Sequence, residues 1–227
     1  MKHLHAADWE EIARRQPYFR VLTHDGSVET IANDVATDAF FETGEADIAA
    51  LIPAIASLLG REPALGTSLD FGCGAGRLTI PLARRSTHTV ACDIAPTMLA
   101  HAAQNVRNAG LQNVAFVGID DLTGPFDFIC SLLVFQYIPP SAGYSMIRTL
   151  LDLLAPGGVA AIQVVSGSSP RSRFMKRAIK RPGCTATNVY DDRAIDREIE
   201  AAGARLIGRF STQPGAVLII EKALYPE

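Results

Sequence analysis

The segment that most constrains the fold is an apolar stretch that runs directly into three alternating glycines, SLDFGCGAGRLT at residues 68–79. Glycine allows a tight turn and a close approach of a ligand to the backbone, and the start of the following helix presents unpaired amide hydrogens. A strand, a glycine turn and a helix in this order favour a site for a nucleotide-like ligand. A turn without a ligand is the alternative, and the spacing of the three glycines makes it the weaker one.

The rest of the chain alternates short apolar runs with longer amphipathic stretches, which is typical of βα units in a mostly parallel sheet. The predicted strands are residues 68–71, 87–92, 114–117, 126–131 and 158–165, followed by a hairpin of 205–211 and 216–222. The predicted helices are residues 96–109, 141–154 and 191–202, and the APGG turn at 155–158 ends the second of them. The pattern therefore indicates the α/β fold class.

The length of the chain fits one α/β domain, because 227 residues with 48% hydrophobic content can bury one sizeable core. Helical patterns at 8–15 and 46–59, the second interrupted by Pro53, predict that residues 1–60 form a helical lid of the same domain. Residues 61–227 then form the ligand-binding part, with a basic insertion near 168–190.

Charge and hydropathy narrow the class of partner. The net charge of -3 and the pI near 6.0 argue against a general nucleic-acid binder, which normally carries an excess of Lys and Arg. Residues 1–8 lack the apolar core of a secretory signal, and no later stretch approaches the length of a membrane span. We therefore expect a cytoplasmic protein with no membrane partner.

The four cysteines lack the close CxxC pairing of a metal or redox motif, so we expect reduced thiols. Three of them, Cys73, Cys92 and Cys130, lie near predicted strand ends and could converge there. Metal coordination requires matched distances and usually a fourth ligand, whereas small apolar packing requires neither. No metal is predicted; Cys184 is the fourth cysteine.

The second strand ends at an acidic residue, Asp93, whose carboxylate can accept hydrogen bonds from both hydroxyls of a ribose. Nicotinamide-binding folds also place an acidic residue about 20 positions after a glycine turn, but their turn is GxGxxG. This chain instead has GxGxG, and IAPTML follows the aspartate at 94–99. The pattern therefore differs from that of a nicotinamide enzyme.

Together, LDFGCGAGRLT at 69–79, ACDIAPTML at 91–99 and LLAPGG at 153–158 resemble the class I (Rossmann-like) S-adenosylmethionine-dependent methyltransferase family. The resemblance covers roughly residues 68–165. It implies a three-layer sandwich with a seven-stranded, mostly parallel sheet that ends in an antiparallel hairpin. It also implies S-adenosylmethionine as cofactor and S-adenosylhomocysteine as product.

The resemblance assigns roles at the cofactor site residue by residue. Asp93 binds the ribose, Ile94 and Met98 lie against the adenine, and Ser131 offers its backbone carbonyl to the ammonium group. The methionine part is surrounded by Asp70, Gly72, Cys73, Gly74 and Gly76.

Several positions depart from the family pattern or stay open. Asp120 is chosen over Asp121 for the adenine amino group, and both could instead cap the turn before Leu122. Ala95 stands where the family usually has serine, which removes a helix-capping hydroxyl. Tyr137 stands where many relatives have histidine, so a histidine base is not supported there.

The acceptor is expected to be a small organic molecule methylated at oxygen or nitrogen, and no catalytic residue is identified. In-line displacement on an activated methyl needs correct positioning more than a base, and His24 is the one histidine nominated for that role. An RNA or protein methyltransferase and a non-catalytic cofactor-binding sensor or partner subunit remain alternatives. The sequence does not indicate an oligomeric state.

Two further features have a functional and a structural interpretation. The cations between 171 and 181 could bind an anionic acceptor or form the solvated side of a helix. The N-terminal aromatic residues could form a lid over an acceptor or the core of that segment; they are Trp9, Tyr18, Phe19, Phe40 and Phe41.

Overall fold

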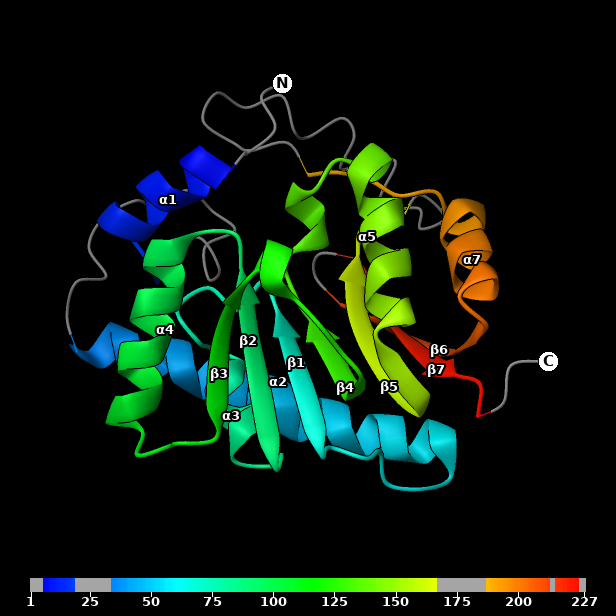
Figure 1. The fold of residues 1–227 in the computed structure, drawn as a ribbon, viewed down its shortest axis with the longest axis horizontal. Helices are drawn as coiled ribbons and strands as arrows, with labels where there is room; N and C mark the ends of the chain where they lie inside the picture. Colours follow the sequence, from blue (N-terminus) through cyan, green and yellow to red (C-terminus); the bar gives the residue numbers. More distant parts are fainter. Residues whose placement is uncertain (1–5, 19–33, 167–186, 213–214, 225–227) are drawn as a thin grey trace. The chain divides into compact units, whose positions relative to one another are not determined.

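A computed structural model describes residues 6–18, 34–166, 187–212 and 215–224, drawn in colour in Figure 1. The chain divides into two compact units, an N-terminal unit within His5–Leu122 and a C-terminal unit within Thr123–Glu227, and each is described by itself. Phe19, His24, Cys184 and the cations at 171–181 lie outside the described residues. Within the described residues, no helix is long and apolar enough to cross a membrane.

The N-terminal unit is built on three parallel strands in the order β3-β2-β1. They are β1 (Thr67–Phe71), β2 (His88–Asp93) and β3 (Val114–Gly118), each within one residue of its predicted bounds. Four of the five residues of β1 are buried, and two of these four, Ser68 and Asp70, are polar. The carboxyl ends of β1 and β2 lie in register, with Phe71 beside Cys92.

Helices cover these strands. α3 (Thr79–Ala83) follows the glycine turn, and α4 (Pro96–Asn108) packs on β2 and β3 as predicted, with Met98, Ala102 and Val106 buried. α1 (Ala6–Arg15) lies against α4, where Trp9 and Ile12 pack on the buried Ala13, Ala95 and Met98.

The first turn of α4 receives its cap from α1. Ala95 occupies the N-cap position and has no side-chain oxygen. The Glu10 carboxylate instead accepts hydrogen bonds from the Thr97 backbone N–H at 3.2 Å and from the Thr97 hydroxyl. These hydrogen bonds lower the pKa of Glu10, and they place a negative charge at the positive end of the helix dipole.

Helix α2 (Asp34–Leu59) is longer than predicted, since the sequence pattern indicated only residues 46–59. It continues through Pro53, which is exposed. Its buried residues recur every three or four positions, which gives one continuous packing face; they are Phe40, Gly44, Ile48, Leu51 and Ile55.

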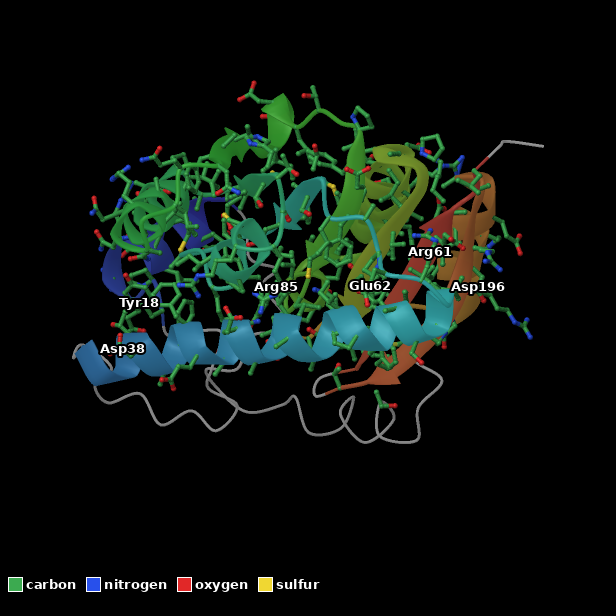
Figure 2. The ribbon with its side chains drawn as sticks, turned by 90° about the horizontal axis from the view of Figure 1, so that it is seen from below. Tyr18, Asp38, Arg61, Glu62, Arg85 and Asp196 are labelled. Atoms are coloured by element: carbon green, nitrogen blue, oxygen red, sulfur yellow. The ribbon has the colours of Figure 1, made fainter. Side chains whose placement is uncertain are left out.

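Close packing explains the glycine in the middle of α2. A Cβ atom at Gly44 would lie 2.1 Å from the Arg77 carbonyl oxygen, so only glycine lets the helix approach the backbone after the glycine turn. The Glu45 carboxylate pairs with Arg84, at 3.2 Å, and with Arg85. In Figure 2, α2 is seen along its length, with Arg85 above its middle.

The C-terminal unit contains the other four strands, in the order β4-β5-β7-β6: β4 (Phe126–Ser131), β5 (Leu154–Val164), β6 (Ala204–Ser211) and β7 (Ala216–Lys222). β4 and β5 are parallel, whereas β7 is antiparallel to both β5 and β6. The fold is therefore the expected seven-stranded mixed sheet that ends in an antiparallel hairpin.

One predicted boundary is wrong. Residues 155–158 were expected to form a turn between a helix and a strand, but β5 begins at Leu154. The pairing of β4 and β5 shifts register between Phe126, which faces Leu154, and Phe128, which faces Val159. The proline and glycines thus form an irregularity within the strand, where Gly157 has a φ of 74°.

Among the described residues of this unit, α5 (Pro140–Asp152) and α7 (Asp192–Ala201) accompany these strands and pack against each other. The fully buried Tyr190 lies before α7, and its ring packs edge-to-face against Phe135 and Tyr144. Asp191 caps α7 by accepting a hydrogen bond from the Ala194 N–H at 3.0 Å.

Replacing Gly44 with alanine separates helix propensity from packing. Propensity alone would stabilise the protein by about 1 kcal/mol, because alanine is the better helix former. We expect a loss of about 1–3 kcal/mol instead, since the Cβ overlaps the Arg77 backbone. Urea denaturation measures whether the free energy of unfolding of Gly44→Ala rises or falls. Glu42→Ala, at an exposed position of α2, is the control, and an increase in stability for Gly44→Ala would contradict the packing.

Glu10→Ala is expected to lower the midpoint of thermal unfolding more than Glu11→Ala. Each variant loses one ion pair within α1, to Arg14 or Arg15, but only the first loses the cap of α4. The lowered pKa of Glu10 means that its contribution is present above the ordinary value of 4.5 and is lost as the pH falls through the folded-state pKa. The two variants should therefore converge in acid, and equal midpoints at pH 7 would rule out the cap.

Candidate functional site

The glycine turn is anchored to the end of β2. The backbone N–H groups of Gly72 and Cys73 both donate to the Cys92 carbonyl oxygen, at 2.8 and 3.0 Å. Gly72, Gly74 and Gly76 all have positive φ, a conformation that side chains disfavour. A Cβ at Gly76 would lie 3.4 Å from the Cα of Ala102, so the turn packs directly on α4.

Asp93 joins the glycine turn to the start of α4. One carboxylate oxygen accepts from the Gly74 N–H and the other from the Ala95 N–H, both at 2.9 Å. A carboxylate has about four lone-pair positions, so each oxygen keeps one for a further donor. Burial raises the pKa of Asp93, although these backbone hydrogen bonds oppose the shift. Asp93, the residue predicted to bind the ribose, is thus held in place by its hydrogen bond to the glycine turn.

Asp70 is a buried acid at the end of β1, with an exposed fraction of only 2%. Burial raises its pKa to about 6, against the lowering effects of Thr79 and Arg77. The Thr79 hydroxyl donates to it at 2.6 Å. Arg77 is itself buried and donates to Asp47 and, at 3.4 Å, to Thr43 of α2.

The two residues expected against adenine differ in exposure. Ile94 is 45% exposed, which leaves an apolar surface beside Asp93. Met98 is buried in the cluster that contains Ala13 and Ala95. In this structure Ile94 is therefore open to a ligand, whereas Met98 packs beneath α1.

The acidic pair after β3 lies in a short 3-10 helix, Ile119–Asp121. Asp120 and Asp121 are both exposed. No side chain caps the start of this helix at Gly118. The choice of Asp120 over Asp121 therefore stays a prediction.

Ser131 ends β4 in the C-terminal unit and is fully buried. Within the described part of the chain, its hydroxyl oxygen has no hydrogen-bond partner, and an unpartnered buried hydroxyl is costly. Leu133, two residues later, has a φ of 64°, a left-handed conformation that costs a branched residue about 1–2 kcal/mol. Tyr137 follows in the short helix Phe135–Tyr137 and is half-buried.

The cysteines behave as small packing residues. Cys73 is buried against Ala91 and Ala102, and burial raises the pKa of its thiol well above the usual value. Cys92 and Cys130 are likewise buried, and neither forms a disulfide bond with another described residue. Among the described residues, no group of three or more His, Cys, Asp or Glu side chains could hold a metal ion.

The N-terminal aromatic residues pack mainly on one another. Tyr18 lies edge-to-face with Phe40 and Phe41, at ring centroid distances of 5.3 and 6.2 Å, and Phe40 is 1% exposed. Figure 2 shows Tyr18 near Asp38, at the first turns of α2. The structural interpretation of these three side chains is therefore the better supported one.

Sequence analysis missed four residues that hold the site: Glu10, Thr79, Asn105 and Gln163. The Asn105 amide donates to the Ala75 carbonyl in the glycine turn at 2.9 Å, and Gln163 is a buried polar residue in a strand. The Nε2 atom of His101 lies 3.2 Å from the Ala13 carbonyl oxygen, a further contact between α4 and α1. Of these four residues, only Gln163 could have been noticed in the sequence, because it is a polar residue inside an otherwise apolar strand.

Comparison with known proteins agrees with this geometry. A family model described as a methyltransferase domain matches residues 43–208. A ubiquinone biosynthesis O-methyltransferase of Xylella fastidiosa is 31% identical over 43% of this chain and 41% of its own length. A trans-aconitate 2-methyltransferase of Methylobacterium radiotolerans is 32% identical over 63% of this chain and 55% of its own length. The chain thus spans about half the length of these curated relatives.

The fold matches a magnesium protoporphyrin IX methyltransferase of Synechocystis, solved with bound S-adenosylhomocysteine, with a TM-score of 0.61 and 22% identity. The match covers 86% of this chain and 90% of that one. The glycine turn, the aspartate that links it to α4 and the family match over most of the chain lead to one conclusion: the chain belongs to the S-adenosylmethionine-dependent class I methyltransferase family.

Proposed function

We propose that this protein transfers the methyl group of S-adenosylmethionine to a small organic acceptor, at oxygen or nitrogen. The observation that carries the proposal is Asp93, whose carboxylate fixes the glycine turn and keeps hydrogen-bonding capacity for the two ribose hydroxyls. The exposed Ile94 beside it offers an apolar surface of the kind that an adenine ring requires.

The remaining cofactor contacts are assigned by family resemblance and supported by local chemistry. The backbone from Gly72 to Gly76, with Cys73 buried behind it, would border the methionine part. Asp70 supplies a buried negative charge suited to a cationic ligand. Ser131 would contribute its carbonyl to the ammonium group, and Met98 and Asp120 remain the proposed adenine contacts.

The bound cofactor would supply a methyl group already activated on a sulfonium. The residues described here then have to bind it, orient it and exclude water, because in-line displacement gains mainly from attack geometry. No general base is assigned among them. α1 contributes by covering the start of α4 beside Ile94, which supports the proposal that the N-terminal helices form part of a lid.

A small acceptor is supported by the names of the relatives, which include a trans-aconitate and a ubiquinone-biosynthesis methyltransferase. The net charge of -3 also favours a small molecule over a nucleic acid. The cations at 171–181 make an anionic acceptor a specific version of this proposal.

Calorimetric titration with S-adenosylmethionine, S-adenosylhomocysteine and NAD tests the cofactor site directly. The wild-type protein should bind the first two and not NAD. Asp93→Asn should weaken binding by about 1.5–3 kcal/mol, or roughly 10- to 150-fold, because hydrogen bonds to a charged group are lost.

Asp38→Asn is the matched control, since it makes the same change of charge at an exposed position of α2. Its affinity should equal that of the wild type. A folded Asp93→Asn protein with unchanged affinity would disprove the ribose assignment. Methyl transfer to candidate small acids, phenols and amines would then identify the acceptor.

Asp70→Asn is expected to raise stability at pH 8 while it weakens cofactor binding. The folded-state pKa of about 6 exceeds the ordinary value of 3.8, so the folded protein binds the extra proton between these values. Stability is therefore lost as the pH rises from about 4 to 6 and stays lower above 6. The difference between these two pKa values corresponds to about 3 kcal/mol of unfolding free energy. This is the largest gain in stability that the neutral asparagine side chain can give.

Urea denaturation at pH 4 and pH 8 measures this effect, with the exposed Asp121→Asn as control. The gain for Asp70→Asn should appear at pH 8 and vanish at pH 4. Calorimetry at pH 8 should show weaker S-adenosylmethionine binding by the stabilised variant. A variant less stable than the wild type at pH 8 would mean that the hydrogen bonds of the carboxylate outweigh its burial.

A further inference from the structure

The segment that follows β4 is held in a strained conformation. Leu133 has a φ of 64°, in the left-handed region that glycine and asparagine adopt more readily than a branched side chain. It lies two residues beyond Ser131, whose buried hydroxyl has no hydrogen-bond partner among the described residues, at the end of a strand where sheets of this kind bind ligands. Strained backbone persists only where the surroundings over-determine it, and it concentrates at functional sites.

The buried amide of Gln163 supplies that constraint. Gln163 lies in β5 and is 6% exposed. Its Oε1 accepts from the Leu133 backbone N–H at 2.8 Å, and its Nε2 donates to the Thr212 hydroxyl at 2.9 Å. Because oxygen and nitrogen both have partners, the amide has a defined orientation.

The Thr212 end of this bridge is itself fixed. The Thr212 N–H donates to the Gly215 carbonyl at 2.9 Å, in the turn between β6 and β7. A Cβ at Gly215 would lie 2.1 Å from the Val164 carbonyl oxygen, so Gly215 packs directly on the end of β5. Gln163 therefore connects Leu133 to a residue that is itself hydrogen-bonded to Gly215.

Other hydrogen bonds hold the residues after Leu133. The Gln136 amide donates to the Leu133 carbonyl at 3.2 Å, and the Asn188 amide donates to the Gln136 carbonyl at 3.1 Å. The Tyr190 hydroxyl lies 2.8 Å from the Ile138 carbonyl. None of these contacts involves the Leu133 N–H. Among the described residues, its one hydrogen-bond acceptor is the Gln163 Oε1 atom.

We infer that Gln163 is a positioning residue for cofactor binding, which acts by holding Leu133 in its left-handed conformation. The orientation of the backbone carbonyls from Ser131 to Leu133 then depends on the Gln163 amide. This inference rests on the proposed contact between the Ser131 carbonyl and the cofactor ammonium. A side chain that merely satisfies a buried hydrogen bond would affect stability but not affinity.

Calorimetric titration of S-adenosylmethionine into single and double variants tests the inference. Gln163→Leu should weaken binding by about tenfold, which is a Kd change of about 1.4 kcal/mol. Gln163→Glu should retain the affinity at pH 6, because a buried, protonated carboxyl group has one acceptor and one donor in the same places.

Leu133→Gly provides the decisive comparison. Glycine adopts the left-handed conformation without support, so the double variant Gln163→Leu with Leu133→Gly should bind within about threefold of the wild type. Leu133→Ala in the same background removes the side chain but not the strain, and it should not restore binding. Thr212→Val removes the hydroxyl that accepts a hydrogen bond from Gln163, and it should change affinity less than Gln163→Leu does.

Unchanged affinity in a folded Gln163→Leu protein would overturn the inference, as would a loss that Leu133→Gly and Leu133→Ala restore equally. Should Gln163→Leu fail to fold, Gln163→Met preserves the side-chain length and replaces it in every comparison. Failure of the wild type to bind S-adenosylmethionine would instead reject the proposed function, so the two failures are distinguishable.

Discussion

The hydrogen bonds of the Asp93 carboxylate are the interaction on which the N-terminal unit depends. Through Gly74 and Ala95 they join the glycine turn to the first residues of α4. The turn can reach that position because its N–H groups also bond to the Cys92 carbonyl and because Gly76 packs on Ala102. Strand, turn and helix therefore form one rigid corner, which reduces the ordering cost of binding a ligand there.

The same corner contains two acidic residues, Asp70 and Asp93, whose carboxyl groups are largely withdrawn from water. Asp70 and Asp93 are both raised in pKa by burial, and each carboxylate raises the pKa of the Cys73 thiol. Burying acids reduces stability unless they are compensated, and Thr79 and Arg77 compensate Asp70 only in part. The positive charge of the proposed ligand would compensate the Asp70 carboxylate further.

The sequence predicted what depends on local pattern. The strands and α4 lie close to their predicted positions because buried parallel strands are unbroken apolar runs and helices show a regular stripe. The APGG segment was misassigned because proline and glycine mark an irregularity as readily as a turn. The early start of α2 was missed because Gly44 has low helix propensity, and its packing on Arg77 is a tertiary contact.

The proposed cofactor contacts follow from motif spacing, whereas the residues that form hydrogen bonds to their backbone do not. Asn105 and Gln163 act through contacts with residues about 30 positions away, and nothing in a local window indicates such partners. Met98 shows that motif spacing can also suggest a ligand contact where the structure has a packing contact. Its spacing after Asp93 suggested a ligand contact, yet α1, from the start of the chain, covers it.

Because α1 caps α4, the structural unit extends further toward the N-terminus than the family match does. The family match starts at residue 43, yet the first turn of α4 takes its capping oxygen from Glu10, well outside that boundary. A protein trimmed to the matched region would keep every cofactor motif but expose Met98 and leave the Thr97 N–H without its acceptor. A shortened protein that keeps α1 would retain this cap, whereas truncations designed from family boundaries alone would remove a structural part of the fold.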